Sequence, residues 1–158
     1  MNTISFVVLG LPQTAGSKKS IPIKNRSTGE WVTRDNGSTL TVTVDDNPKS
    51  KHWKAAVAWE AKKVYQGPLL TGPLHVAFTF FMPRPAGHYG SGSRANQLKP
   101  SSPRWPITRP DVLKLSRAAE DGLTNVIWRD DSQIADARVI RCYRETPGAD
   151  VRIEEMTT

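Results

Sequence analysis

The chain has 158 residues and carries 22 Lys and Arg against 15 Asp and Glu, which gives a net charge of +7. It contains no run of about 18 apolar residues, which excludes a membrane-spanning helix, and its first six residues argue against a secretory signal. One cysteine, Cys142, and three separated histidines exclude a disulfide framework and argue against a cysteine- or histidine-dominated metal site. We therefore expect a cytoplasmic, membrane-free protein whose charge favours a polyanionic partner, nucleic acid first. The alternative is a domain that is merely basic.

The first third of the chain predicts strands separated by a basic loop. Ile4–Leu9 is an apolar run that ends at a glycine, which predicts a buried strand. Residues 13–20 are small and basic without apolar periodicity, so they predict a loop. Residues 31–33 and 40–44 alternate like short strands, with a turn at residues 35–37.

The middle of the chain predicts a helix, a strand and a long basic loop. Residues 50–65 predict a helix, and residues 74–82 predict a strand. Residues 83–110 hold six prolines and five Lys or Arg but no acidic residue, and a structureless segment of this length is usually functional or disordered. The apolar positions of the helix recur at helical spacing: Trp53, Val57, Ala61 and Val64.

The last third predicts a second helix and two closing strands. Residues 111–123 predict the helix, with Val112, Leu115, Ala119 and Leu123 on one face. Residues 134–143 and 150–155 alternate like strands, with a turn at residues 146–149. Without repeats or a domain boundary, this order predicts a single α+β domain over residues 1–158. We expect a mixed β-sheet with two main helices on one face.

Three carboxylates are the first candidates for chemistry. Asp111 stands at the start of the second predicted helix, and Asp130 and Asp131 lie in a turn some twenty residues later. Carboxylates of this kind hold Mg²⁺ together with water and a substrate phosphate, and the ion activates water against a phosphodiester. The alternative is that Asp111 caps the helix and that Asp130 and Asp131 are ordinary turn residues.

Basic and aromatic side chains are the second candidates. Lysines and arginines on exposed segments contact DNA phosphates, and a solvated charged surface is the alternative for each of them. Tyr89 and Trp105, in the long loop, either stack on an unpaired base or pack the loop onto its own domain, which we favour for Trp105. The candidates for DNA contact are Lys18, Lys19, Arg84, Arg104, Arg109 and Lys114.

Several motifs together resemble the RusA family of Holliday junction resolvases. They are Arg109-Pro110-Asp111, the helical Asp121-Gly122-Leu123, and Asp130-Asp131-Ser132-Gln133-Ile134. Supporting matches are the loop Gly16-Ser17-Lys18, Asp46-Asn47-Pro48-Lys49 before a Trp-containing helix, and Arg84-Pro85. The resemblance covers most of the chain, and the Asp-Asp-Ser-Gln-Ile element with the Pro-Asp helix is its more specific part.

The resemblance implies a RusA-like fold and a small homodimeric endonuclease that binds four-way junction DNA. Such an enzyme makes paired symmetric cuts with Mg²⁺ or Mn²⁺, in recombination and repair. Its metal-binding carboxylates fall on Asp111 and Asp131, with Asp130 as a neighbour, and its catalytic lysine falls on Arg117. Arginine keeps the positive charge but not the shape or the ability to lose a proton, so we read it as a phosphate or transition-state contact.

One position departs from the family pattern. The second aspartate of the helix start falls on Leu113, which lies away from the apolar face of the predicted helix and cannot bind a metal. It is either an ordinary exposed leucine or a lost ligand, and we favour the lost ligand. Glu120, about 10 Å farther along the axis, is too far away to replace it directly. We therefore expect weak metal binding and reduced cleavage. The alternatives are a catalytically inactive junction-binding protein and a basic RNA-binding or nucleoprotein domain.

Overall fold

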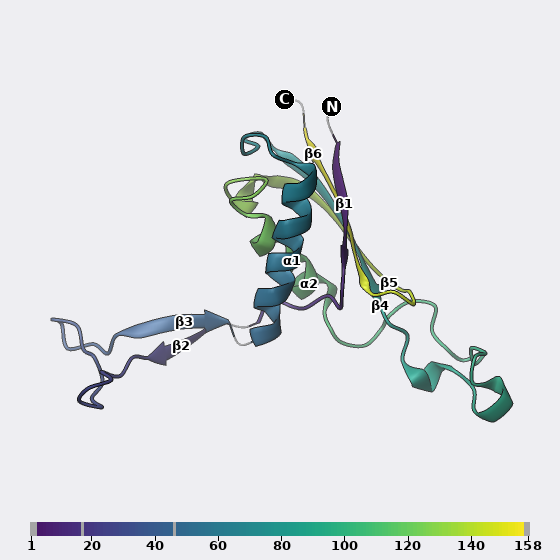
Figure 1. Ribbon diagram of the computed structural model, residues 1–158, viewed down its shortest axis with the longest axis horizontal. Coiled ribbons are helices and arrows are strands. Elements are labelled where there is room, and N and C mark those ends of the chain that lie inside the picture. The colour runs from purple at the N-terminus through teal and green to yellow at the C-terminus, as the bar shows by residue number, and fades with distance from the viewer. Residues whose placement is uncertain (1–2, 17, 46, 157–158) are drawn as a thin grey trace.

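Four strands form one mixed sheet in the order β1-β6-β4-β5 (Figure 1). The computed structural model describes residues 3–16, 18–45 and 47–156. Neighbouring strands are antiparallel except β4 and β5, which are parallel because a helical crossover joins them. The strands are β1 (Thr3–Leu9), β4 (Leu74–Met82), β5 (Ile134–Tyr143) and β6 (Gly148–Glu155).

Both helices, α1 (Pro48–Val64) and α2 (Val112–Leu123), lie on the same face of this sheet (Figure 1). Every second side chain of the strands points toward them, and each such buried apolar side chain contributes about 1.5–3 kcal/mol. The structure confirms the α+β class with a mixed sheet and two helices on one face. The strand side chains of this core include Phe6, Val8, Val76, Phe78, Phe80, Val151 and Ile153.

Helix α1 begins and packs largely as its sequence predicts. The side chain of Asn47 caps the helix by accepting a hydrogen bond from the backbone N–H of Lys49 at 3.1 Å. Trp53, Val57 and Ala61 are buried, but Val64 is 52% exposed because the helix ends there. The prediction that Val64 belongs to the buried stripe is therefore wrong. Within the described ranges, neither helix is long and apolar enough to cross a membrane.

The basic segment near the N-terminus differs from its prediction. β2 (Lys18–Pro22) pairs with β3 (Thr41–Asp45) in a separate antiparallel hairpin, whereas we expected a loop over residues 13–20. Residues 31–33 form only isolated bridges, not the expected strand. The sequence of β2 gave no apolar alternation because this hairpin extends away from the core, so neither of its faces is buried (Figure 1).

The long segment 83–110 has hydrogen bonds of its own. It contains two short 3₁₀ helices, η1 (Ala86–His88) and η2 (Gly92–Arg94). Its two halves are joined by Ser102 Oγ, which donates to the His88 carbonyl at 2.6 Å, and by Lys99 Nζ, which donates to the Gly87 carbonyl at 2.8 Å. It leaves the end of β4 and extends to the other side of the molecule from the β2–β3 hairpin (Figure 1).

Candidate active site

Helix α2 presents one buried and one exposed face. Leu115, Ala119 and Leu123 are fully buried, as the sequence predicts, and Val112 is half-buried. Gly122 permits the close approach of α1, because a Cβ at this position would lie 2.8 Å from the Lys54 carbonyl oxygen. This packing fixes which side chains of α2 face outward.

The centre of the exposed face is a stripe of three side chains one turn apart. Leu113 is 72% exposed, Arg117 is exposed, and Glu120 is half-buried. The Ser116 hydroxyl lies beside the stripe and donates to the Leu113 carbonyl at 3.0 Å. The prediction that Leu113 lies outside the apolar face is confirmed. Packing in the core therefore does not explain why this position carries an apolar residue.

Asp111 precedes α2 as its N-cap residue, but its side chain makes no capping hydrogen bond. The carboxylate is exposed and lies 3.7 Å from Lys114 Nζ. The ordinary capping role considered for Asp111 is therefore absent, and its carboxylate remains available to a ligand.

Arg141 of β5 fixes the chain that leads into Asp111. Its guanidinium donates to the carbonyl oxygens of Pro106, Thr108 and Pro110. These three acceptors lie within the five residues before Asp111. The Arg141 side chain therefore holds the segment 106–110, which leads into α2, against the sheet.

We expect Arg141→Ala to make the segment 106–110 more mobile while the sheet stays folded. Three charge-assisted hydrogen bonds are lost, so the free energy of unfolding should fall by about 1.5–3 kcal/mol. Hydrogen exchange of the Leu115 amide, which donates to the Asp111 carbonyl at the start of α2, should become faster than in the wild type, whereas exchange in β4 should not change. Equal acceleration in both segments would contradict a local role for Arg141.

The turn that carries Asp130 and Asp131 is a short 3₁₀ helix, η3 (Asp131–Gln133), closed by a capping box. Asp130 Oδ1 accepts from the Ser132 N–H at 2.8 Å. Hydrogen bonds from the Ser132 side chain and backbone hold the pKa of Asp130 below its ordinary value. The turn role considered for Asp130 is therefore present, and the exposed Asp131 follows it.

Gln133 holds this turn to the rest of the domain. Its Oε1 accepts from the backbone N–H groups of Arg129 and Asp130 at 3.0 and 3.1 Å. Its Nε2 donates to the carbonyls of Leu70 and Gly72 at 2.9 and 3.3 Å. One amide side chain thus positions the Asp-Asp turn against the segment before β4.

Glu120 lies within range of the charge on Asp131. Burial raises the pKa of Glu120, the nearby Ser116 hydroxyl lowers it, and the negative charges of Asp131 and Asp121 raise it further. We had set Glu120 aside as too distant from Leu113. The structure shows that it shares the surroundings of Asp131 and so belongs to the candidate site.

Because its pKa is raised, the ionised Glu120 lowers the free energy of unfolding at neutral pH. The folded state binds its proton more tightly than the unfolded state, so this cost is absent well below the ordinary pKa of 4.5 and grows as the pH rises. We expect Glu120→Gln, which keeps the size of the side chain and removes its charge, to raise the melting temperature by about 1–3 °C near pH 7. The gain should vanish near pH 3.5. A pH-independent gain would contradict the assignment.

The acidic groups do not form a compact cluster. In the part of the chain that the structure describes, no three His, Cys, Asp or Glu side chains are placed to hold one metal ion together. The charge of Asp131 acts on Glu120, and Asp111 is paired with Lys114. Such a donor set still fits Mg²⁺, which accepts one or two carboxylates and takes water and substrate phosphate for its other positions.

The basic candidates lie on separate segments of the chain. Arg84 differs from the others because its guanidinium donates to the Pro103 carbonyl at 2.9 Å and lies 4.2 Å over the Tyr143 ring. It therefore holds the long loop in place. The side chain of Lys18 lies outside the described residues, and the remaining candidates are exposed: Lys19, Arg104, Arg109 and Lys114.

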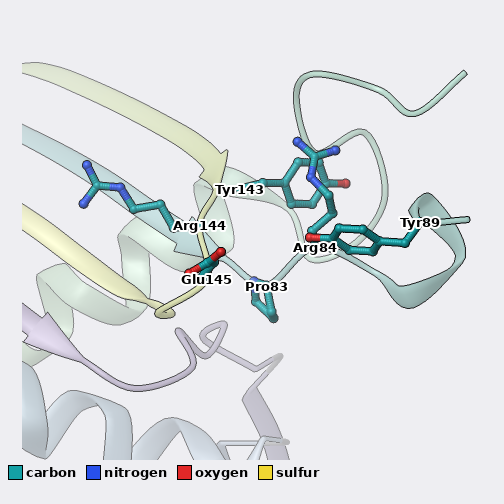
Figure 2. A pocket seen from close by; sticks show the side chains of 6 residues that line it. All are labelled: Pro83, Arg84, Tyr89, Tyr143, Arg144 and Glu145. Carbon is teal, nitrogen blue, oxygen red and sulfur yellow. The ribbon is translucent and has the colours of Figure 1, made fainter. Parts of the chain in front are cut away.

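A hollow of about 410 Å³ lies where the long loop leaves the sheet (Figure 2). Arg84 and Tyr89 from the loop line it together with Tyr143 at the end of β5 (Figure 2). Trp105 is 50% exposed, with the Arg104 guanidinium 5.6 Å from its ring centre. The packing role that we favoured for Trp105 therefore leaves half of its side chain in solvent, and both aromatic rings remain candidates for stacking on a base.

A family model for the endodeoxyribonuclease RusA matches residues 23–154. The chain belongs to the RusA endodeoxyribonuclease family. It is also 29% identical over 157 residues to the uncharacterized protein YqaN of Bacillus subtilis (strain 168), with 99% of each chain covered. The RusA family acts on junction DNA, so membership supports a Holliday junction resolvase function for this chain.

The sequence did not predict the roles of two residues that organise the candidate site, although Gln133 lies in the Asp-Asp-Ser-Gln-Ile motif. Arg141 and Gln133 both work through backbone carbonyls of distant segments, which no local pattern reveals. Gln133 had one signal, because a Gln three residues after an Asp is the signature of a capping box. The sequence signal for Arg141 was weaker: it is a charged residue on the face of β5 that points toward the helices, where apolar residues are expected.

Proposed function

We propose that this RusA-family protein recognises four-way DNA junctions and cuts two opposing strands with Mg²⁺ or Mn²⁺, at a rate reduced by Leu113. The observation that carries the proposal is the exposed stripe of α2. It begins beside a carboxylate that makes no capping bond, Asp111, and ends at Glu120, on which the charge of a second carboxylate, Asp131, acts. Between them lie a cation, Arg117, and an exposed leucine.

Asp111 and Asp131 would hold the divalent ion, with Asp130 as a neighbour that retains one oxygen outside its capping bond. When bound, the ion activates water and stabilises the charge that develops on a phosphodiester. Glu120 adds negative charge near Asp131, which favours cation binding at that end of α2.

The remaining chemistry belongs to the protein's own side chains. Arg117 is exposed between Leu113 and Glu120, so its guanidinium can bind a scissile phosphate and neutralise charge in the transition state. Lys114 pairs with Asp111 and is positioned to bind an adjacent phosphate. Gln133 and Arg141 fix the two acidic segments, which keeps the carboxylates in place before DNA arrives.

The two basic projections would bind the arms of the junction. The β2–β3 hairpin supplies Lys18 and Lys19, and the long loop supplies Arg84, Arg104 and Arg109. They extend in opposite directions from the body that carries α2 (Figure 1). Phosphate contacts on both sides of a central site suit a branched substrate better than a single straight duplex.

Paired symmetric cuts require two sites related by a twofold axis, so we propose that the active form is a homodimer. A four-way junction offers matching strands at a symmetric branch point, and a dimer presents one α2 site to each of them.

Competition binding and cleavage test the proposal together. The protein is mixed with a labelled four-way junction and excess linear duplex of the same sequence, then with Mg²⁺ or Mn²⁺. We expect a complex that survives at least a tenfold excess of duplex, and slow paired nicks in opposing strands. Loss of the complex to linear duplex would favour a general nucleic-acid-binding domain.

Binding without any product would favour the second candidate, a catalytically inactive junction-binding protein. The observation behind this candidate is Leu113 itself, because an exposed leucine at a ligand position removes one carboxylate from the site.

A further inference from the structure

The hollow beside the long loop lies where two parallel strands end side by side. Met82, the last residue of β4, is paired with Tyr143, the last residue of β5, and the next N–H, of Arg144, donates to the Met82 carbonyl at 2.9 Å. The volume of about 410 Å³ falls within the roughly 300–1,000 Å³ that is usual for small-ligand sites. This loop hollow is lined by six residues: Pro83, Arg84, Tyr89, Tyr143, Arg144 and Glu145.

Tyr89 supplies an aromatic ring that has no stacking partner among the described residues. Its side chain is half-buried, and its hydroxyl makes no hydrogen bond within residues 3–16, 18–45 and 47–156. Its backbone is nevertheless fixed, because its N–H donates to the Ala86 carbonyl at 3.0 Å and it forms a β-bridge with Leu98. A ring held in this way is a surface on which a base can stack.

Arg84 supplies a second flat surface, which is held even more firmly. Its guanidinium donates to the Pro103 carbonyl at 2.9 Å and lies 4.2 Å over the Tyr143 ring. The His88 ring meets Tyr143 edge-on, with the ring centres 5.6 Å apart, so Tyr143 is supported from a second side. A guanidinium that stacks on a tyrosine with one face can stack on a nucleobase with the other.

Arg144 supplies a cation at the strand end of the loop hollow. In Figure 2, Tyr89 and Arg144 stand at opposite ends of the lining, with Arg84 and Tyr143 between them. The Arg144 guanidinium lies 4.0 Å over the Phe81 ring and makes no hydrogen bond to the described part of the chain. Its N–H groups are therefore available to a phosphate. A stacking surface at one end and a cation at the other match the two parts of a nucleotide.

Glu145 indicates that the ligand is more than a bare anion. Its carboxylate is exposed and lines the same hollow as the two arginines. It repels an inorganic phosphate ion, whereas it can accept a hydrogen bond from the exocyclic amino group of a base. The lining therefore suits a nucleotide better than a free phosphate.

The loop hollow lies close to the chain that leads into the candidate active site. Tyr143 and Arg141 are two residues apart on the same face of β5, which is a distance of about 7 Å along the strand. The Arg141 guanidinium donates to the Pro110 carbonyl, and Asp111 follows directly. A DNA strand with a phosphate at Asp111 can therefore place a nearby nucleotide in the loop hollow.

We propose that the loop hollow binds one unpaired nucleotide of a DNA strand. The base stacks on the Tyr89 ring and the Arg84 guanidinium, and Arg144 binds the phosphate that follows. A base must leave its neighbours in the duplex to enter, and this costs least where the strand is already unpaired, as at an opened branch point. The loop hollow thus adds recognition of an unpaired base, which an intact linear duplex does not offer.

This inference rests on the proposed function in taking DNA as the partner. Its test uses single-stranded DNA without a junction and without a metal. The junction assays can therefore succeed when this test fails, and this test can succeed when the protein shows no preference for junctions over linear duplex.

Fluorescence of a base analogue tests the stacking directly. The probe is a single-stranded thymidine oligonucleotide with one central 2-aminopurine, whose emission falls when it stacks. We expect the emission to fall to a plateau as the full-length protein is added. Tyr89→Leu, which keeps an apolar side chain to hold the loop but removes the ring, should leave the emission unquenched. It should also weaken binding by about fivefold or more.

Two further variants are the controls for Tyr89→Leu. Tyr89→Phe keeps the ring and should retain the quenching and affinity of the wild type. Trp59→Leu makes a matched substitution at an exposed aromatic residue of α1, 64% exposed and outside the loop hollow, and should also behave as the wild type. Circular dichroism confirms that each variant is folded. Equal quenching by Tyr89→Leu and the wild type, or a wild type that binds the probe without quenching or does not bind it, overturns the proposal.

The salt dependence of binding tests the cation separately. Arg144→Gln should reduce the slope of the logarithm of affinity against the logarithm of salt concentration by about 0.7, as expected for one lost phosphate contact to a single strand. The emission at saturation should still fall, because Tyr89 and Arg84 remain. Arg144→Lys should restore the slope. An unchanged slope for Arg144→Gln overturns the assignment of Arg144 to the phosphate.

Discussion

Replacing Leu113 by aspartate should increase metal-dependent cleavage of a four-way junction by at least tenfold. Leu113 is exposed on α2 in the same stripe as Arg117, so an aspartate there needs no repacking of the core. It restores a carboxylate between Asp111 and the surroundings of Asp131, and an added oxygen ligand strengthens the hold on a hard cation. A tenfold rate corresponds to about 1.4 kcal/mol of transition-state stabilisation.

The matched control is Leu113→Ala, which removes the apolar side chain without supplying a ligand. It should cleave no faster than the wild type. If Leu113→Ala and Leu113→Asp gain equally, then the leucine obstructs DNA and does not mark a lost ligand. If neither gains, the reading of Leu113 as the cause of weak activity is wrong.

Replacing Gln133 by alanine should produce the largest loss of stability among exposed or half-buried polar residues of the site. Its amide joins four backbone groups, two in the Asp-Asp turn and two in the segment before β4. At roughly 1 kcal/mol for each lost hydrogen bond, the free energy of unfolding should fall by about 2–4 kcal/mol. The melting temperature should fall by about 5–15 °C.

The control for this substitution is Gln97→Ala in the long loop. The Gln97 side chain is exposed, and the hydrogen bonds of this residue are made by its backbone. Thermal unfolding should change by less than about 0.5 kcal/mol. If both substitutions lower the free energy of unfolding by similar amounts, the effect at Gln133 comes from shortening the side chain in general and not from loss of the hydrogen bonds that hold the acidic turn.

The sequence predicts the central elements because they follow strong periodicities. β4 and β5 have the predicted bounds, and both helices bury the predicted faces apart from Val64, since burial of one face forces apolar residues to recur. The β2–β3 hairpin escaped prediction for the same reason, because a hairpin that buries neither face shows no such recurrence.

The candidate site was predictable only as a set of residue types. The motifs place Asp111, Arg117 and Asp131 near one helix, and the structure adds how they are held. Glu120 was set aside because its distance from Leu113 along the helix axis says nothing of its distance from Asp131, whose charge acts on it. The hydrogen bonds of Arg141 reach backbone carbonyls more than thirty residues away in sequence, which no local pattern predicts.

Metal-dependent cleavage by Leu113→Asp with and without Asp131→Asn tests the central claim most directly. Each protein is incubated with an end-labelled four-way junction and Mg²⁺, and the cut strands are mapped over time, with Glu60→Gln as a substitution of an acidic residue on α1. We predict paired cuts in opposing strands by Leu113→Asp, and at least a hundredfold loss when Asp131→Asn is added. Equal rates with and without Asp131→Asn, or equal cutting of linear duplex, would contradict a junction nuclease built on this acidic turn.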